Sequence, residues 1–194
     1  MPSSTTSTGG ADHAVHSPVS GNSSPQPVEL SLRQVTWDDV PLMYEIGIDP
    51  ASCEMAGVKP PTREAFIERW KAIFQDPAVS TRIIEIITRD SSGTELAREF
   101  AGSISVFQAP GEDRDSIGYW IARSHWGMGI ASRALALFLA QEPRRPLYAT
   151  AATTNAASLR VLDRNGFKLV RTYLCEETDR YLAREVAEFV LDAP

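Results

Sequence analysis

The 194-residue chain lacks the features that define several large classes of protein. It has only two cysteines, Cys53 and Cys175, which stand far apart with no C-x-x-C spacing. Two isolated thiols indicate a reduced, cytoplasmic protein rather than a disulfide framework or a zinc site. Of its three histidines, His13 and His16 lie near the N-terminus. His125 alone is too little for a histidine-based metal cage, so we expect no metal.

Long apolar runs and an excess of positive charge are absent as well. No uninterrupted apolar run approaches the ~18–20 residues of a membrane span, and no basic cluster followed by an apolar core marks a secretory signal. The chain has 19 basic and 25 acidic residues, a net charge of −6. It therefore lacks the basic face of a general nucleic-acid binder. We expect a cytoplasmic protein with neither a membrane nor a nucleic acid as partner.

Charge is scarcest in residues 1–27, where Asp12 is the only charged residue and Ser, Thr, Gly and Pro dominate. Such a segment buries too little apolar surface to offset the entropy of ordering it. We therefore predict a disordered, low-complexity tail at 1–27. The remainder, 28–194, has the size of one ordinary domain.

Strand-like and helix-like patterns alternate along that remainder. Alternating apolar and polar residues predict a strand at 28–35. Thr36 and Thr62 are N-cap candidates for two helices, the second of which runs to about Gln75. Further strands are predicted at 82–88, 100–107, 117–122, 147–152, 167–175 and 183–191, and further helices at 127–141 and 155–165. This order predicts a mixed α/β sheet with helices on both faces.

The most informative stretch runs from Ile121 to Ala131, where a strand leads directly into a helix through Gly127-x-Gly129. Free amides and the dipole of a helix N-terminus attract anions, and glycines let phosphate oxygens approach the backbone. A dinucleotide fingerprint or a P-loop fits poorly, because both patterns fail at Ser132. Glycines in an ordinary strand-to-helix turn, or another nucleotide-phosphate site, remain the alternatives at this point.

Four short motifs in a fixed order resemble the Gcn5-related N-acetyltransferases (GNAT). They are Ile117-Gly-Tyr-Trp120 with Ser124-His125, Gly127-Met-Gly-Ile-Ala131, Asn155-x-x-Ser158 and Arg164-Asn-Gly-Phe167. The combination is similar to the branch of ribosomal-protein alanine/serine N-terminal acetyltransferases and covers about residues 28–191. The resemblance implies a mostly antiparallel central sheet and an enzyme that moves an acetyl group from acetyl-coenzyme A to a primary amine. That amine would belong to a protein N-terminus or to a small molecule.

The resemblance also implies which residues bind coenzyme A. The strand around Ile121 and Arg123 would pair with the pantetheine arm, and residues 124–129 would wrap the pyrophosphate. The full implied set is Ile121, Arg123, Ser124, His125, Trp126, Gly127, Met128, Gly129, Ile130, Ala131, Asn155 and Ser158. The chain departs from the family at Ser124, where Gln or Arg is usual, and Arg123 is the candidate to supply the charge.

Acyl transfer to an amine needs a neutral amine, a stabilised oxyanion and a proton for the departing thiolate. Many family members place a Tyr on the helix before Gly-Phe, but this chain has Leu162 there. The resemblance therefore implies Ser158 as the acid; its plainer interpretation is a residue that supports a helix start. The implied general base is Glu177, although Glu176-Glu177 also fits a solvated acidic turn. Other carboxylate candidates for the base are Asp115, Glu85 and Glu99.

A non-catalytic acyl-coenzyme A sensor is the alternative function. The missing helix Tyr, Ser124 in the pyrophosphate signature and Ser116 in place of a Glu favour it. The net negative charge mildly favours a cationic acceptor. Specificity for that acceptor is expected in residues 37–75 and 108–115, which carry no readable motif. Family members are often homodimers, although no residue of this chain indicates one.

Overall fold

The computed structural model describes residues 29–109 and 111–193, so the tail predicted at 1–27 lies outside the described residues. Seven strands form one mixed sheet with the order β1-β2-β3-β4-β5-β7-β6. The strands are β1 (Glu29–Gln34), β2 (Ser80–Arg89), β3 (Glu95–Gln108), β4 (Asp115–Ile121), β5 (Leu147–Ala152), β6 (Lys168–Cys175) and β7 (Arg184–Leu191). All neighbours are antiparallel except β4 and β5. The predicted fold class is therefore confirmed.

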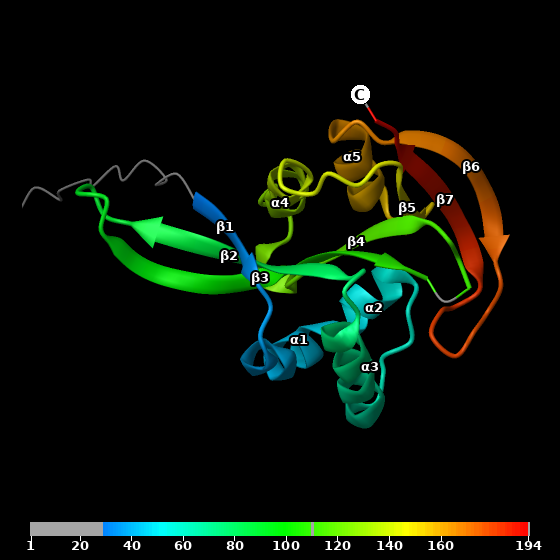
Figure 1. Cartoon of the computed structure of the whole chain (residues 1–194), viewed down its shortest axis with the longest axis horizontal. Coiled ribbons are helices and arrows are strands. Elements are labelled where there is room, and N and C mark those ends of the chain that lie inside the picture. Colours follow the sequence, from blue (N-terminus) through cyan, green and yellow to red (C-terminus); the bar gives the residue numbers. More distant parts are fainter. Residues whose placement is uncertain (1–28, 110, 194) are drawn as a thin grey trace, which may run out of the picture.

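Helices cover both faces of this sheet (Figure 1). The helices are α1 (Val40–Gly47), α2 (Pro50–Ala56), α3 (Arg63–Gln75), α4 (Ile130–Leu139) and α5 (Ala156–Arg164), with short 3-10 turns at Trp37–Asp39 and Arg123–His125. The first three helices lie on one face, and α4 and α5 lie on the other. In the described residues, no helix has the length and apolar character needed to cross a membrane.

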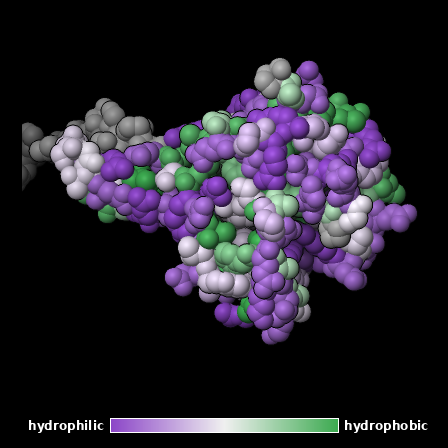
Figure 2. Space-filling view, in the orientation of Figure 1, coloured by the Kyte–Doolittle hydropathy of each residue, from purple (hydrophilic) through white to green (hydrophobic). Residues whose placement is uncertain are grey.

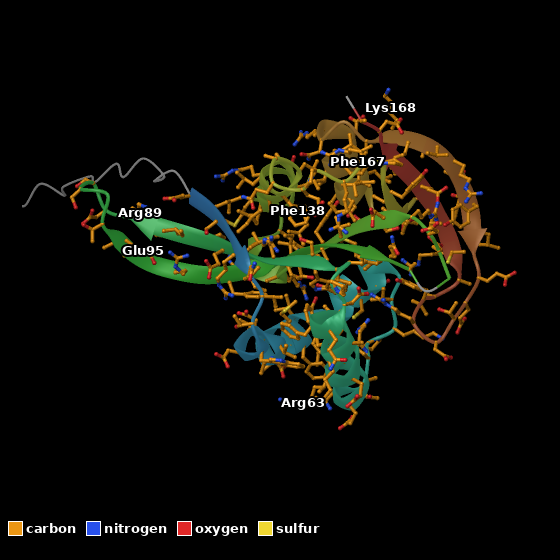
Figure 3. The ribbon with its side chains drawn as sticks, viewed as in Figure 1. Arg63, Arg89, Glu95, Phe138, Phe167 and Lys168 are labelled. Atoms are coloured by element: carbon orange, nitrogen blue, oxygen red, sulfur yellow. The ribbon has the colours of Figure 1, made fainter. Side chains whose placement is uncertain are left out.

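The alternation of side chains along each strand divides the core into two clusters. Ile83 packs with Phe66 and Trp70 of α3, whereas its neighbour Ile84 packs with Leu135 and Phe138 of α4. Figure 3 labels Phe138 and Phe167, which belong to the cluster on the α4 and α5 side. The β2–β3 ribbon extends beyond both layers, and Figure 3 labels Arg89 and Glu95 near its far end.

Side-chain caps start the helices where the sequence predicts them. The backbone N–H of Thr36 donates to Asp39 Oδ2 at 2.8 Å, which completes a capping box. At the start of α3, Thr62 Oγ1 accepts from the backbone N–H of Ala65 at 3.2 Å. The helix predicted after Thr36 begins as a 3-10 turn and continues as α1. Both predicted N-caps are therefore confirmed.

The prediction of two helices before the second strand is wrong, because the structure contains a third, α2. This helix has only seven residues, too few to show a clear 3.6-residue period. Only the residues at its two ends indicate a helix in the sequence. Asp49 caps its first turn by accepting from Ser52 N at 2.9 Å, Pro50 occupies its first position, and Gly57 ends it with a φ of 70°.

Two predicted boundaries also shift. The helix predicted at 127–141 begins at Ile130, because Gly127 and Gly129 have φ angles of 76° and 72°, which an α-helix excludes. The strand predicted at 100–107 begins earlier, at Glu95, where β3 pairs with β2 in the long ribbon.

The surface is mostly polar, in keeping with apolar clusters buried between the sheet and its helices. The face shown in Figure 2 is largely hydrophilic with scattered apolar side chains.

The two parallel strands in the middle of the sheet are barely joined. In the described chain, β4 and β5 share one register pair, Ser116 with Tyr148, whereas β4 pairs with β3 along seven residues. We call the region between residues 117–121 of β4 and 149–152 of β5 the β4–β5 split. Because parallel strands end at the same sheet edge, the split opens where the Gly127-x-Gly129 turn and the start of α5 lie.

Candidate active site

The turn between β4 and α4 presents backbone amides at one end of the split. Gly129 is the N-cap of α4, and the N–H groups of its first turn have no partner within the helix. A Cβ added at Gly127 or Gly129 would meet no atom within 4 Å. Glycine is therefore required here by the positive φ angles and leaves open space in front of the helix. These residues fit a phosphate-bearing ligand such as coenzyme A.

Polar side chains of the 3-10 turn lie beside these glycines. Arg123 is 65% exposed, and its Nη1 is 3.7 Å from Asp49 Oδ1, the N-cap of α2. Hydrogen bonds from Ser52 and the charge of Arg123 hold the pKa of Asp49 below its usual value. The contact links the predicted cofactor loop to the helices on the other face of the sheet.

The other side chains of the loop contact the protein itself. His125 Nε2 is 3.5 Å from Glu99 Oε2, and its Nδ1 is 3.1 Å from Ser124 Oγ. Trp126 Nε1 donates to the backbone oxygen of Ile121 at 2.9 Å and fixes the loop to the strand end. Met128, between the two glycines, is exposed. Ile130 is buried, and Ala131 packs partly against the same core.

The start of α5 lies across the split from β4. Asn155 Oδ1 accepts from Ser158 N at 3.0 Å, so Asn155 is the predicted N-cap, and its Nδ2 donates to Met55 O of α2 at 3.4 Å. Tyr119 Oη donates to the main-chain oxygen of Ser158 at 3.5 Å. The Ser158 hydroxyl makes no hydrogen bond to another described residue. The fold thus brings Ser158 next to β4, from which it is distant in sequence, and Asn155 next to α2.

The α5 position at which many GNAT proteins carry a Tyr does not face this site. Leu162 is 2% exposed and packs in the core with Phe138 of α4. Gly166 ends the helix with a φ of 83°, and the N–H of Phe167 donates to the Leu162 oxygen at 3.1 Å. The φ angle of Gly166 and the hydrogen bond of Phe167 are both typical of the end of a helix and give neither residue a catalytic role.

Glu177 lies in the loop between β6 and β7, where it is 59% exposed and pairs with Lys59 Nζ at 2.6 Å. Backbone hydrogen bonds between Lys59 and Arg180, and between Leu182 and Gly57, dock this loop on the α2–α3 connection. In the described part of the chain, no hydrogen bond or ion pair joins Glu177 to Ser158. The structure therefore places Glu177 beside Lys59 of the α2–α3 connection. It does not bring Glu177 into contact with the start of α5.

The three other carboxylate candidates are engaged elsewhere. Glu85 is buried between Arg33, at 2.7 Å, and Arg98. Asp115 Oδ1 lies 3.5 Å from Arg144 Nη1, at the end of β4 remote from the glycines. Glu99 faces His125. Glu85 and Asp115 thus have arginine partners outside the split, whereas Glu99 lies beside the imidazole of the cofactor loop.

Sequence reasoning missed two residues of this region. Arg184 of β7 donates from Nη1 to Glu54 O at 2.8 Å and packs so closely on Gly57 that a Cβ there would lie 2.4 Å from its Nε. It caps the carboxyl end of α2, and no local signal marks it. Tyr119 stands inside the Ile117-Gly-Tyr-Trp120 motif, for which the resemblance implies no chemical role. Burial raises the pKa of Tyr119, and its hydrogen bond to Ser158 opposes that rise only in part.

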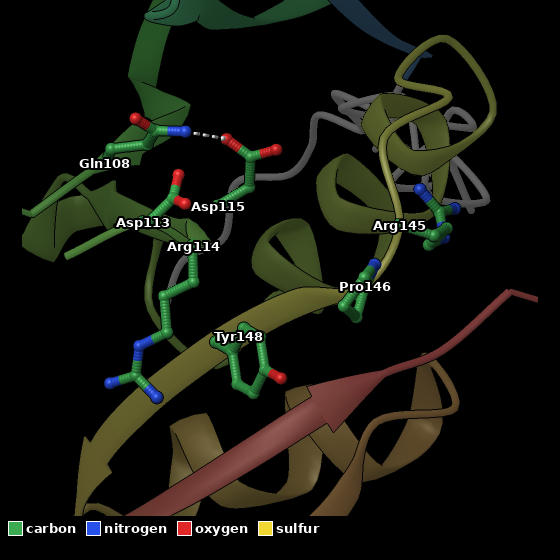
Figure 4. Close-up of a pocket in the computed structure, with 7 residues that line it drawn as sticks. All are labelled: Gln108, Asp113, Arg114, Asp115, Arg145, Pro146 and Tyr148. Carbon is green, nitrogen blue, oxygen red and sulfur yellow. Dashed lines mark hydrogen bonds between the residues drawn. The ribbon is translucent and has the colours of Figure 1, made fainter.

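A cavity of about 300 Å³ lies at the other end of β4 (Figure 4). Its lining residues are Gln108, Asp113, Arg114, Asp115, Arg145, Pro146 and Tyr148. The Arg114 guanidinium lies over the Tyr148 ring, 4.8 Å from its centroid, and pairs with the buried Glu188 at 2.6 Å. Since Asp115 begins β4, this polar cavity lies at the opposite end of the strand from the glycine turn.

Comparison with known families identifies the class of protein to which this fold belongs. A family model described as an acetyltransferase (GNAT) domain matches residues 29–168. The chain therefore belongs to the GNAT family, as the sequence predicts. No curated protein sequence matches the chain significantly.

Solved structures share this fold at low sequence identity. Spermidine N-acetyltransferase from Vibrio cholerae, in complex with CoA and spermine, has a TM-score of 0.66 and 14% identity over 84% of this chain and 95% of that chain. The ribosomal L7/L12 alpha-N-protein acetyltransferase RimL, in complex with coenzyme A, has a TM-score of 0.63 and 20% identity over 84% and 93%. An acetyl transferase from Salmonella typhimurium that modifies the N-terminal serine of L7/L12 has 0.63 and 20% over 85% and 95%. The neighbours thus include the branch that the sequence resembles.

Proposed function

We propose that the protein is an acetyl-coenzyme A-dependent N-acetyltransferase whose acceptor is a primary amine of a protein N-terminus or a small molecule. The observation that carries the proposal is the β4–β5 split, with a glycine turn at its open edge and the start of α5 beside it. Structures of similar fold were determined with coenzyme A, and the acceptors for which those proteins are named, spermidine and a ribosomal protein N-terminus, are amines. We also propose a cytoplasmic location, in which the two cysteines would stay reduced.

Backbone groups would hold the cofactor in this site. The loop of residues 124–129 would wrap the pyrophosphate. The amides of residues 127–131 would bind it, because those of His125 and Trp126 already donate to the oxygens of Ala122 and Arg123. Ile121 and Arg123 would bind the pantetheine arm through the free edge of β4. Arg123 is exposed and only loosely paired with Asp49, so its guanidinium is available for the charge that Ser124 lacks. Bound acetyl-coenzyme A would supply the acetyl group.

Ser158 and Glu177 would serve the chemistry. The Ser158 hydroxyl stands at the helix start beside Tyr119 and would assist the departing thiolate. Glu177 would accept the proton of the acceptor amine. Its pair with Lys59 is exposed, and such pairs contribute only about 0–1 kcal/mol. An ammonium group of the acceptor can therefore replace Lys59 at little cost.

A non-catalytic acyl-coenzyme A sensor is the second candidate. It is favoured by the buried Leu162 and by the basic side chains that pair with three of the candidate carboxylates, Glu85, Asp115 and Glu177. A sensor would bind coenzyme A tightly and release no thiol with any amine.

Calorimetry and a thiol-release assay test both candidates. We expect coenzyme A to bind more tightly than ATP or NAD, and acetyl-coenzyme A to release thiol with some member of a panel of polyamines, aminoglycosides, amino acids and peptides. Ser158→Ala and Glu177→Gln should each lower kcat at least about tenfold, or about 1.4 kcal/mol, with coenzyme A affinity retained.

Glu29→Gln is the matched control for Glu177→Gln, because Glu29 is also an exposed carboxylate paired with a basic side chain, Arg89, at 2.6 Å, but on the far edge strand β1. It should leave kcat unchanged. Tighter binding of ATP or NAD than of coenzyme A would overturn the acetyltransferase proposal. Tight coenzyme A binding without turnover would favour the sensor.

A further inference from the structure

The fold brings the phenol of Tyr119 to the start of α5, where the thiol of the cofactor is proposed to lie. Tyr119 lies on β4 between Ile117 and Ile121 and packs partly against the core under α4 and α5. Its Oη reaches across the split to the main-chain oxygen of Ser158 at 3.5 Å. This contact joins the strand proposed to bind the pantetheine arm to the helix start proposed to meet the sulfur.

The helix that usually supplies a phenol supplies none here. Leu162 is apolar and buried in the core, so α5 has no acid at that position. Ser158 offers an aliphatic hydroxyl, which is a far weaker acid than a phenol. Tyr is among the side chains that act as general acids in enzymes. Tyr119 therefore supplies, beside the start of α5, a phenol in place of the one that the helix lacks.

We propose that Tyr119 is a catalytic residue that protonates the departing sulfur, with the phenol contributed by strand β4 instead of helix α5. This proposal rests on the proposed acetyltransferase function and refines the part given to Ser158. The hydroxyl of Ser158 then orients the sulfur by a hydrogen bond, and Tyr119 delivers the proton.

The proton and bond changes balance within the site. The amine nitrogen forms a bond to the acetyl carbonyl carbon, and the carbon–sulfur bond breaks. The sulfur takes the proton of Tyr119 Oη and becomes a thiol. The nitrogen gives up one proton through Glu177 and solvent, and an equivalent proton from solvent restores the phenol. No oxidant or further reactant is required.

Two features of Tyr119 suit this task. Its hydrogen bond to Ser158 is at the long limit for such bonds, so the phenol can turn toward a ligand without losing a strong interaction. Burial raises the pKa of Tyr119, which keeps the phenol protonated at neutral pH. In the described chain the phenol hydrogen-bonds to a main-chain carbonyl, and the rise in the pKa of Tyr119 comes from burial rather than from a nearby charge.

Substitution by phenylalanine is the first test. Tyr119→Phe removes one oxygen from a packed ring, and we expect kcat to fall about 100-fold or more while KM for acetyl-coenzyme A and the affinity for coenzyme A change little. Tyr173→Phe, which makes the same change on strand β6, should retain the wild-type kcat. Equal kcat in Tyr119→Phe and wild type would overturn the proposal.

A pH profile separates a proton donor from a structural residue. Activity that requires the phenol is lost as pH rises through its pKa, and ring fluorination lowers that pKa. Replacement of Tyr119 by difluorotyrosine should therefore move the alkaline limb of kcat to lower pH, whereas Ser158→Ala should leave the limb in place. An unmoved limb in the fluorinated protein would exclude proton donation by Tyr119.

A binding readout keeps the test valid even if no acceptor is found. The fluorine resonance of difluorotyrosine at position 119 should shift with coenzyme A and shift differently with desulfo-coenzyme A, because the phenol contacts the sulfur. The same probe at Tyr173 should report neither ligand. Identical spectra with the two ligands at position 119 would overturn the placement. Lack of turnover by the wild type with every amine would count against the proposed function instead.

Discussion

Gly129 is the N-cap of α4 and has a φ of 72°, a conformation that costs a residue with a Cβ about 1–2 kcal/mol. A Cβ there would meet no protein atom within 4 Å and would instead project into the space in front of the helix. We therefore expect Gly129→Ala to weaken coenzyme A binding about tenfold, equivalent to about 1.4 kcal/mol, as measured by calorimetry.

Gly93 is a matched control for this substitution. It has a φ of 86°, its Cβ would also meet nothing within 4 Å, and it lies in the turn between β2 and β3. Gly93→Ala should carry the same cost of about 1–2 kcal/mol, measured as a lower free energy of unfolding in urea. It should leave the affinity for coenzyme A unchanged. A similar loss of affinity in both variants would show that strain spreads through the fold rather than acting at the ligand.

At the scale of elements, α5 depends on its cap because a nine-residue helix is marginal on its own. Asn155→Ala removes the acceptor for Ser158 N and should lower the free energy of unfolding by about 1 kcal/mol. Asn155→Asp keeps the acceptor and places a negative charge at the helix N-terminus, so it should retain most of that stability. Urea unfolding of the two variants measures the difference.

The aspartate variant also loses the hydrogen bond from Asn155 Nδ2 to Met55 O of α2, which is 3.4 Å long. If Asn155→Asp is as unstable as Asn155→Ala, this link between α5 and α2 stabilises the protein more than the cap does.

The features of single helices and turns can largely be predicted from the sequence, whereas the contacts between elements cannot. The caps at Thr62 and Asn155 and the turn at Gly129 depend on neighbours within four residues, so the sequence shows them directly. The type and order of most elements follow from local periodicity. Helix α2 was missed because it is shorter than the window in which that periodicity shows.

Distant partners carry no such local signal. Glu177 meets Lys59 across 118 positions, and Arg184 meets Glu54 across 130. Tyr119 meets Ser158 across 39, although each residue belongs to a recognised motif. The insertion of the last strand, β7, between β5 and β6 decides which side chains share a face, and no single segment of sequence specifies it.

At the scale of the whole molecule, buried carboxylates should set the response of stability to acid. Hydrogen bonds from Arg33 and from Arg144 lower the pKa values of Asp39 and Glu142. Burial alone would raise the pKa of Glu188, but hydrogen bonds from its two arginine partners outweigh burial and lower it. Near pH 4 the unfolded chain therefore binds more protons than the folded protein.

The sign of this linkage predicts a stability that is fully present above the ordinary carboxyl values, 4.5 for Glu and 3.8 for Asp, and is lost as pH falls through the lower folded values. We expect thermal midpoints to vary little with these groups between about pH 6 and 8 and to fall steeply below about pH 4.5. Thermal unfolding followed by circular dichroism across this range provides the measurement.

Glu188→Gln should lower stability at pH 7 and weaken the acid dependence, because Glu188 is 2% exposed and pairs with both Arg114 and Arg171. Glu68→Gln is its surface counterpart, since Glu68 pairs with Lys71 in the open, and should change neither quantity appreciably. An acid slope that is identical in Glu188→Gln and wild type would assign the effect to other groups.

The single register pair between β4 and β5 also decides how the two halves of the molecule communicate mechanically. Strands β1 to β4 form one continuous hydrogen-bonded ladder, and β5, β7 and β6 form another. Ile117 of the first and Leu147 of the second meet Leu135 and Phe138 of α4 in one core cluster. Because the strands themselves join the two ladders at one pair, cooperativity between the halves relies on the side-chain packing of α4 and on the backbone hydrogen bonds that Lys59 and Leu182 make between the α2–α3 connection and the β6–β7 loop.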